Sequence, residues 1–267
     1  MPTQATAKRS LIQKALESAR FGHLTKWVVM SSFIGFLAGI VAWLFRGMIH
    51  FTRHRLFEAP SGVHGEGLGA ASLAHWWIVF VPAIGGLCVG ALVFWIAPEA
   101  EGHGTDSVIR AFHRLKGQIR ARVIAVKALT SAITIGTGGS AGQEGPVAQV
   151  GAGLGSTLAQ ALKLSDRDRR LFLLAGGSAG IGAMFGSPLG GALFMPEVLY
   201  RRADFEGEAI IPCIVASTFA YATFTSITNT HRVVELPPEV LSQLTFEPSQ
   251  LWIYLILAAV CTAVGYL

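Results

Sequence analysis

Between Lys127 and Lys163 the chain carries one charged residue, Glu144, within a long apolar and glycine-rich stretch. Uncharged runs of near-membrane length, 128–143 and 145–161, lie on either side of it. A carboxylate inside a hydrocarbon layer is costly unless it is paired, solvated or protonated. The stretch therefore restricts the chain to folds in which helices enclose an isolated acid at membrane depth.

Uncharged runs of this kind recur along the chain, at 27–45, 76–96, 171–196, 209–230 and 251–267. Only 14% of the residues are charged, whereas about 25% is usual for a soluble domain. This balance excludes a disordered chain, a nucleic-acid-binding protein and most cytosolic enzymes. We predict an all-α, polytopic membrane protein in a lipid bilayer, with no metal and no cofactor.

Several of these runs are interrupted by glycine and proline. Residues 136–146, 176–180 and 186–190 are glycine-rich, and Pro188 suits the first turn of a new helix. Non-helical backbone at membrane depth is tolerated only where protein or a wet cavity surrounds it. Broken helices of this kind indicate an ion or solute site near mid-membrane. Glycine pairs four residues apart, such as Gly35 with Gly39, also predict close helix packing.

The basic residues are unevenly distributed. If the N-terminus is inside, sixteen of the 21 lysines and arginines fall in the N-terminal arm and the segments 110–122, 163–170 and 201–202. Four fall in the outer loops. This asymmetry predicts a protein of the cell membrane with a cytoplasmic N-terminus. Residues 1–26 are expected to form a cytoplasmic arm with a short interfacial helix, although a solvated helix fits the same pattern.

Two glycine-containing segments have the sequence of a helix start. Glu144 precedes Gly145 and Pro146, so its carboxylate is expected at a helix N-terminus, where free N–H groups attract anions. An acid near the helix cap explains the same residue without any anion. Residues 102–106 precede a short helix and present backbone N–H groups in the same way, or form an ordinary turn with Asp106 as the N-cap.

Other patterns carry less weight. Ser140 and Ser178 both stand in G-x-S-x-G sequences, but a hydrolase elbow needs a preceding strand, and here the flanks are apolar runs of membrane length. We therefore do not expect an enzyme. A zinc site at His50, His54, Glu58 and His64 is also less consistent with the sequence than polar groups at a helix end.

Three motifs, in this order, resemble signatures of the CLC family of chloride channels and proton-coupled anion exchangers. Residues 102–106 (GHGTD) resemble the family's G-S-G-I-P sequence, and residues 142–146 (GQEGP) resemble G-[KR]-E-G-P. Residues 185–198 resemble the helix pair that follows, and Lys127 falls at the family's basic position. The resemblance extends from about Thr25 to the end of the chain.

The resemblance implies a fold of two inverted repeats of tilted, broken helices. Residues 27–230 would be the first repeat with two filter segments, and residues 231–267 an outer loop and the truncated start of the second repeat. It also implies a homodimer that transports chloride or a similar small anion, binds no nucleic acid, and receives the second repeat in cis or from a partner chain.

The same resemblance assigns the site residues. Glu144 would be the gating carboxylate, which swings aside or takes up a proton to admit chloride. The residues expected to bind the anion are Gly102, His103, Gly104, Thr105, Asp106, Gly142, Gln143, Gly145 and Pro146.

The sequence departs from the family pattern at several positions. Gln143 replaces the usual basic residue, and Asp106 adds a negative charge near the expected anion path. Val198 stands where proton-coupled members carry an inner carboxylate, and the adjacent Glu197 is an uncertain member of a proton path. We therefore expect channel-like conduction, with proton-coupled exchange as the alternative. A third filter segment would lie beyond Leu267, so a non-conducting half-subunit that needs a partner chain is a further alternative.

Overall fold

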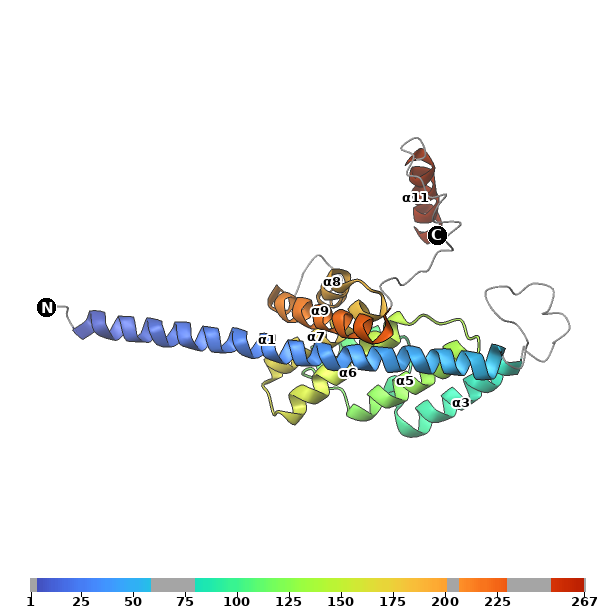
Figure 1. Cartoon of the computed structure of the whole chain (residues 1–267), viewed down its shortest axis with the longest axis horizontal. Helices are drawn as coiled ribbons and strands as arrows, with labels where there is room; N and C mark the ends of the chain where they lie inside the picture. The colour runs from blue at the N-terminus through green and yellow to red at the C-terminus, as the bar shows by residue number, and fades with distance from the viewer. Residues whose placement is uncertain (1–3, 59–79, 201–206, 230–250, 267) are drawn as a thin grey trace. The chain divides into compact units, whose positions relative to one another are not determined.

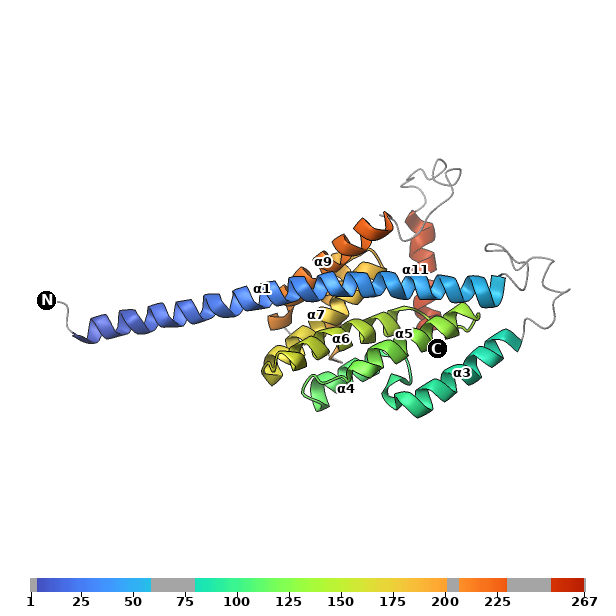
Figure 2. The same ribbon diagram turned by 60° about the horizontal axis from the view of Figure 1, so that its bottom comes forward.

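The computed structural model describes residues 4–58, 80–200, 207–229 and 251–266, and within these ranges it describes side chains from residue 24 to residue 265. The described residues form helices and connecting turns, as the all-α prediction required (Figures 1 and 2). The chain divides into two units, residues 1–231 and 232–267. The helices of the first unit are α1 (Gln4–Arg53), α3 (Phe80–Ile96), α4 (Thr105–Arg114), α5 (Ala121–Gly136), α6 (Glu144–Ala161), α7 (Asp166–Met184), α8 (Pro188–Val198) and α9 (Ile210–Thr228).

Three short helical turns extend this set in the first unit. A π-helical turn, His54–Glu58, follows α1, and 3-10 turns at Pro98–Ala100 and Gly207–Ala209 precede α4 and α9. The second unit contains the apolar helix α11 (Leu251–Tyr266).

Helix α1 differs from the sequence-based prediction. It runs unbroken across residue 26, where we expected a separate short helix to end and the first span to begin. The reason is local, because no proline lies between Gln4 and Arg53 to stop the helix. The arm and the first span are therefore one helix, and the interfacial location of the arm stays a prediction.

Two described segments are long and apolar enough to cross a bilayer, Leu24–Glu58 and Gly207–Thr228. Two shorter apolar helices are Phe80–Ile96 and Leu251–Gly265. Large apolar side chains cover the outside of α3, where Phe94 is 77% exposed. Apolar exposure on this scale is unfavourable in water and suits contact with lipid.

Helix α7 forms the centre of the first unit. Its residues from Leu171 to Met184 are all buried, and α1, α6, α8 and α9 pack around it. The glycine pairs explain how the helices approach so closely. A Cβ on Gly151 would collide with the carbonyl of Gly176, and Gly35 and Gly39 meet backbone carbonyls of α9 in the same way. The prediction of close packing at these glycines is confirmed.

Two of the three predicted helix breaks are present, whereas the prediction of a break at residues 176–180 is wrong, because these small residues pack inside the continuous helix α7. Helix α5 ends at Gly136 and α6 begins at Glu144, so no continuous helix passes through the acid. Helix α7 ends at Met184, and Pro188 opens α8 at its first position with Ser187 as the N-cap. Proline is tolerated there because the amide that it lacks would have no acceptor within the helix.

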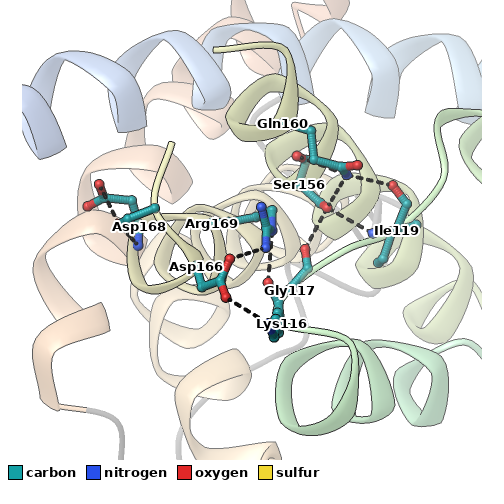
Figure 3. Close-up of polar contacts among 9 residues, drawn as sticks. Lys116, Gly117, Ile119, Ser156, Gln160, Asp166, Asp168 and Arg169 are labelled. Carbon is teal, nitrogen blue, oxygen red and sulfur yellow. Dashed lines mark hydrogen bonds and ion pairs between the residues drawn. The ribbon is translucent and has the colours of Figure 1, made fainter. Parts of the chain in front are cut away.

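At one end of the bundle, polar side chains connect the helices to one another. We name this region the basic end and define it by Lys26, Lys116, Asp166, Arg167, Asp168, Arg169, Arg170 and Glu208. Asp166 accepts from Arg169 at 2.6 Å and lies 3.6 Å from the Lys116 ammonium (Figure 3). Arg169 also donates to the Lys116 carbonyl at 2.8 Å. Every cation of this region belongs to a segment that the sequence analysis placed inside.

Asp168 joins α1 to the first turn of α7 at the basic end. Its carboxylate accepts from Lys26 Nζ at 2.6 Å and from Trp27 Nε1 at 3.1 Å, and Ser165 adds a third donor. Burial raises the pKa of this carboxyl, but the hydrogen bonds from Lys26, Trp27 and Ser165 outweigh burial and hold the pKa below its usual value. The contact therefore fixes the depth of α1 against α7.

Candidate functional site

The two glycine motifs lie far apart in sequence but meet in space. A Cβ on Gly145 would collide with the carbonyl of His103, and one on Gly104 would collide with the carbonyl of Gly145. Gly104 also has a φ of +110°, which a side chain would strain. Segments 102–106 and 142–146 are therefore in backbone contact that only glycine permits at these positions.

Helices α4 and α6 both begin at this contact. The first α4 hydrogen bond runs from the Val108 amide to the Gly104 carbonyl, and the first α6 bond from the Val147 amide to the Gln143 carbonyl. The amides that precede them have no acceptor within their own helix. Neither N-cap residue, Gly104 or Gln143, supplies a side-chain cap. Two positive helix ends thus meet with their N–H groups uncapped.

The alternative that made Asp106 an N-cap is wrong, whereas the position of Glu144 next to the cap of a helix is as expected. Asp106 occupies the second position of α4, and the N-cap is Gly104. Glu144 is the first residue of α6, and its N-cap is Gln143. Asp106 is exposed in the first turn, where a negative charge favours the helix N-terminus but also lies near the segment expected to bind anions.

Lys127 of α5 supports segment 102–106 by donating hydrogen bonds to the backbone at and before its start. Its ammonium donates to the carbonyl of Ala100 at 3.0 Å and to that of Gly102 at 2.6 Å, and the residue is only 4% exposed. The described residues place no carboxylate in an ion pair with it. The side chain therefore stabilises the turn before α4. It also brings a cationic group, which has no carboxylate partner in the described chain, close to the glycine contact.

Gln149 is a site residue that the sequence analysis missed. Its amide nitrogen donates to the Glu99 carbonyl at 3.0 Å, which ties α6 to the turn before α4. Its amide oxygen is buried beside Gly104 and has no partner among the described residues. A polar side chain in the apolar run that follows Glu144 was the available signal.

Glu144 lies where the sequence placed it along the chain but in a different environment. Its carboxylate folds back over Gly142, so a Cβ on that glycine would meet Glu144 Oε2. The side chain is exposed rather than buried in the described part of the chain. The expected helix break is present, whereas the expected burial is not.

An open cleft of about 760 Å³ adjoins the glycine contact. Its polar lining includes His103, Lys127, Ser131 and Ser140, and α3 contributes its apolar wall. The His103 ring lies 3.2 Å from the Thr105 hydroxyl, which orients the imidazole within the first segment. The predicted residues Gly102, Gly142 and Pro146 also line this cleft, so both segments face one space.

Within the described chain, the other residues that the sequence analysis considered, apart from Ser140, do not line this cleft. Glu197 is exposed in the last turn of α8, and its side chain makes no hydrogen bond or ion pair with the glycine segments in the described chain. Ser178 is fully buried. Within the described residues no group of three metal-ligating side chains occurs. His54 instead lies 3.4 Å from Glu58, and His64 falls outside the described residues.

Comparison with known proteins supplies independent evidence. A model of the family described as voltage gated chloride channel matches residues 85–267. A chloride/fluoride channel protein of Pseudomonas syringae pv. tomato is 28% identical over 86% of this chain and 45% of its own length. The H(+)/Cl(−) exchange transporter ClcA of Cronobacter sakazakii is 31% identical over 89% of this chain and 50% of its own length.

Solved structures agree with this match at the level of the fold. A CLC-type fluoride/proton antiporter superposes with a TM-score of 0.71 at 24% identity, covering 91% of this chain and 56% of that protein. A slow cyanobacterial Cl−/H+ antiporter gives a TM-score of 0.68 at 20% identity, covering 90% of this chain and 55% of that protein. The chain thus spans about half the length of the proteins that it matches.

Proposed function

This chain belongs to the voltage gated chloride channel (CLC) family, and on that premise we propose that it contributes half of a transmembrane anion pathway. The observation that carries the proposal is the meeting of two uncapped helix N-termini at Gly104 and Gly145. CLC proteins are transporters and channels rather than enzymes, which removes the hydrolase alternative.

The proposed chemistry is electrostatic. Backbone N–H groups at the starts of α4 and α6 replace the water of a small anion such as chloride, and Lys127 adds a fixed positive charge beneath them. Glycine at the contact lets the backbone itself, rather than a side chain, approach the ion. His103, Thr105 and Gln143 line the same segments and adjust the local field.

Glu144 is the proposed gate. As the first residue of α6, its carboxylate competes with the anion for the same N–H groups. Protonation removes the charge, and rotation away from the helix end removes the competition. Either event frees the site for an anion, which couples anion passage to the protonation state of one side chain.

Proton-coupled exchange is favoured over passive conduction. Val198 led us to expect a channel, but the named relatives include H(+)/Cl(−) exchange transporters, and the solved structures include antiporters for chloride and for fluoride. Glu197 is then the proposed inner proton acceptor, because it lies exposed at the end of α8 that adjoins the basic end.

The depth of the site supports this function. From Gly145 to Ser156, which bonds to the Gly117 carbonyl next to the basic end, α6 rises about 16 Å, near half of a hydrocarbon core of about 30 Å. We propose that the basic end faces the cytoplasm in a cell membrane. A homodimer, with the second repeat supplied in cis or by another chain, completes the proposed assembly.

The test is anion flux through liposomes that contain the protein expressed from its complete reading frame. Glu144→Gln is expected to retain chloride efflux but to bring the ratio of efflux at acidic and neutral pH close to one. Proton movement driven by a chloride gradient should disappear in the variant. Glu101→Gln, which removes a neighbouring carboxylate from the same cleft, is the matched control and should keep the wild-type pH response.

Unchanged pH dependence and unchanged proton movement in Glu144→Gln would overturn the gate assignment. Wild-type protein that moves chloride but never moves protons uphill would instead restore the channel interpretation. Flux that requires co-expression of a second chain would identify the half-subunit alternative.

A further inference from the structure

A second cavity, of about 420 Å³, lies at the basic end, away from the glycine contact. Helices α4 and α7 form its walls, and Tyr200 and Glu208 flank it. Phe112 and Leu171 give it apolar walls, whereas Arg167 and Arg170 bring two guanidinium groups to it. A site with apolar walls and paired arginines has the composition of a phosphate-binding pocket.

Arg170 is the unusual member of this cavity. Its guanidinium lies over the Phe112 ring, 5.6 Å from the centroid, and so is held in place from one side. Its Nε is buried without a hydrogen-bond partner, and the described chain offers the side chain no ion pair. The residue as a whole is half-buried, so the rest of the guanidinium can face the cavity, where the described chain gives it no carboxylate partner.

Two carboxylates, Asp166 and Glu208, also line the cavity, and both already have cationic partners. Asp166 is paired with Arg169 and Lys116, and Glu208 accepts from Arg167 at 3.0 Å and 2.5 Å. Two arginines and two carboxylates line the cavity, and Lys116 and Arg169 approach Asp166 from outside the lining. The cavity and these two neighbours together thus have four cations for two carboxylates, and within the described chain Arg170 is the cation without a carboxylate partner.

The remaining wall adds a polar and aromatic contact surface. The His113 ring packs edge-on against both Phe112 and Tyr200, and its Nε2 lies 3.1 Å from the Leu199 carbonyl. That bond leaves Nδ1 of the imidazole for another partner. His113 lies in the last turn of α4, and the first turn of this helix belongs to the first glycine segment. An occupant of the cavity would therefore contact a helix of the proposed anion site.

We infer that this cavity binds a phosphate group, with the Arg170 guanidinium as the principal contact and the His113 ring beside it. Phosphate matches the forked geometry of arginine and supplies the acceptor oxygens that Arg170 lacks. The ligand is either the headgroup of an anionic lipid, which a basic cavity at a cytoplasmic membrane surface selects, or free phosphate. This site is separate from the anion pathway proposed above.

Binding is measured on the whole protein in nanodiscs. In the first arm, phosphatidylcholine discs receive increasing fractions of phosphatidylglycerol, and native mass spectrometry counts retained lipids. In the second arm, inorganic phosphate is titrated against protein in phosphatidylcholine discs, with thermal unfolding as the readout. Arg170→Gln should weaken one binding event about tenfold or more in the arm that contains the true ligand.

Arg122→Gln is the matched control, because Arg122 is an exposed cation of the same predicted inner surface and does not line the cavity. Wild-type binding in Arg170→Gln, or equal losses in both variants, would overturn the proposal. Arg170→Lys keeps the positive charge but lacks the forked guanidinium, so it should bind phosphate with intermediate affinity. This variant replaces Arg170→Gln if the protein does not fold with a neutral residue at position 170.

A wild-type measurement covers the case in which Arg170→Gln does not fold. A phosphatidylglycerol with a photoreactive headgroup should crosslink to peptides that contain Phe112 or Leu171. Crosslinks that are confined to other peptides would contradict the assignment. Because these readouts record binding rather than flux, their failure would leave the proposed anion pathway untouched.

Discussion

The glycine contact and the basic end satisfy their polar groups in opposite ways. At the glycine contact, the N-termini of α4 and α6 meet without side-chain caps, and the backbone is left with free donors. At the basic end, Asp166 and Asp168 are each held by two or more side chains. Backbone donors stay available at the glycine contact, whereas Asp166 and Asp168 at the basic end are engaged by donors from neighbouring side chains.

This contrast separates the proposed anion site from the ion pairs of Asp166 and Asp168, which connect helices. Uncapped helix ends are unfavourable in isolation, so they persist where a ligand can complete them. Ion pairs at helix ends instead fix the helices to one another. The glycine contact should therefore respond to substitution mainly in transport, whereas the basic end should respond mainly in stability.

The largest effect is expected from Gly145→Ala. The new methyl group would collide with the His103 carbonyl, which is backbone and cannot rotate away. Overpacking of this kind costs about 1–3 kcal/mol and would separate the two segments. Chloride flux should fall about tenfold or more, since each 1.4 kcal/mol of lost binding is a factor of ten.

Gly47→Ala is the control for that substitution, because a Cβ there meets nothing within 4 Å and Gly47 does not line the cleft. It lies in α1, where alanine is a better helix former than glycine, so flux should be unchanged and stability equal or slightly higher. Normal flux in Gly145→Ala would show that the backbone contact does not shape the pathway.

The next effect is expected from Lys127→Met. This change keeps the length of the side chain but removes the charge and both bonds to the carbonyls of Ala100 and Gly102. Hydrogen bonds to a charged group contribute about 1.5–3 kcal/mol, so chloride affinity measured by calorimetry should fall about tenfold. Chloride affinity equal to that of the wild type would limit Lys127 to a structural role.

The sequence predicted local features of this site better than distant contacts. Glycine and proline leave strong local signals, so the helix breaks before Glu144 and Pro188 were predicted correctly. The bond from Gln149 to the Glu99 carbonyl joins residues far apart in sequence and has no local signature. The exposure of Glu144 was also not predictable, because it depends on which elements pack above the start of α6.

A smaller and purely structural effect is expected from Asp168→Asn at the basic end. The pKa of Asp168 is lowered in the folded protein, so the carboxylate stabilises the fold above the unfolded value of about 3.9. That contribution is lost as the pH falls through the lower, folded-state value. The variant should unfold at a lower temperature than the wild type at neutral pH while transporting normally.

The difference in unfolding temperature between Asp168→Asn and the wild type should then shrink in acid. A difference that stays constant from neutral pH to below about pH 3 would mean that the ionised carboxylate is not its source. If Asp168→Asn lost transport but kept its stability, the proposed division between the glycine contact and the basic end would be wrong.

The smallest effect is expected from Glu208→Gln, which removes the partner of Arg167 at the same end. The two side chains are 66% and 52% exposed, unlike Asp168, which is 10% exposed. Solvent screens an exposed pair, so the free energy of unfolding should change by less than about 1 kcal/mol. Thermal unfolding of both variants in low and high salt measures this comparison. If Glu208→Gln destabilised the protein as much as Asp168→Asn, the number of ion pairs rather than their burial would determine the stability of the basic end.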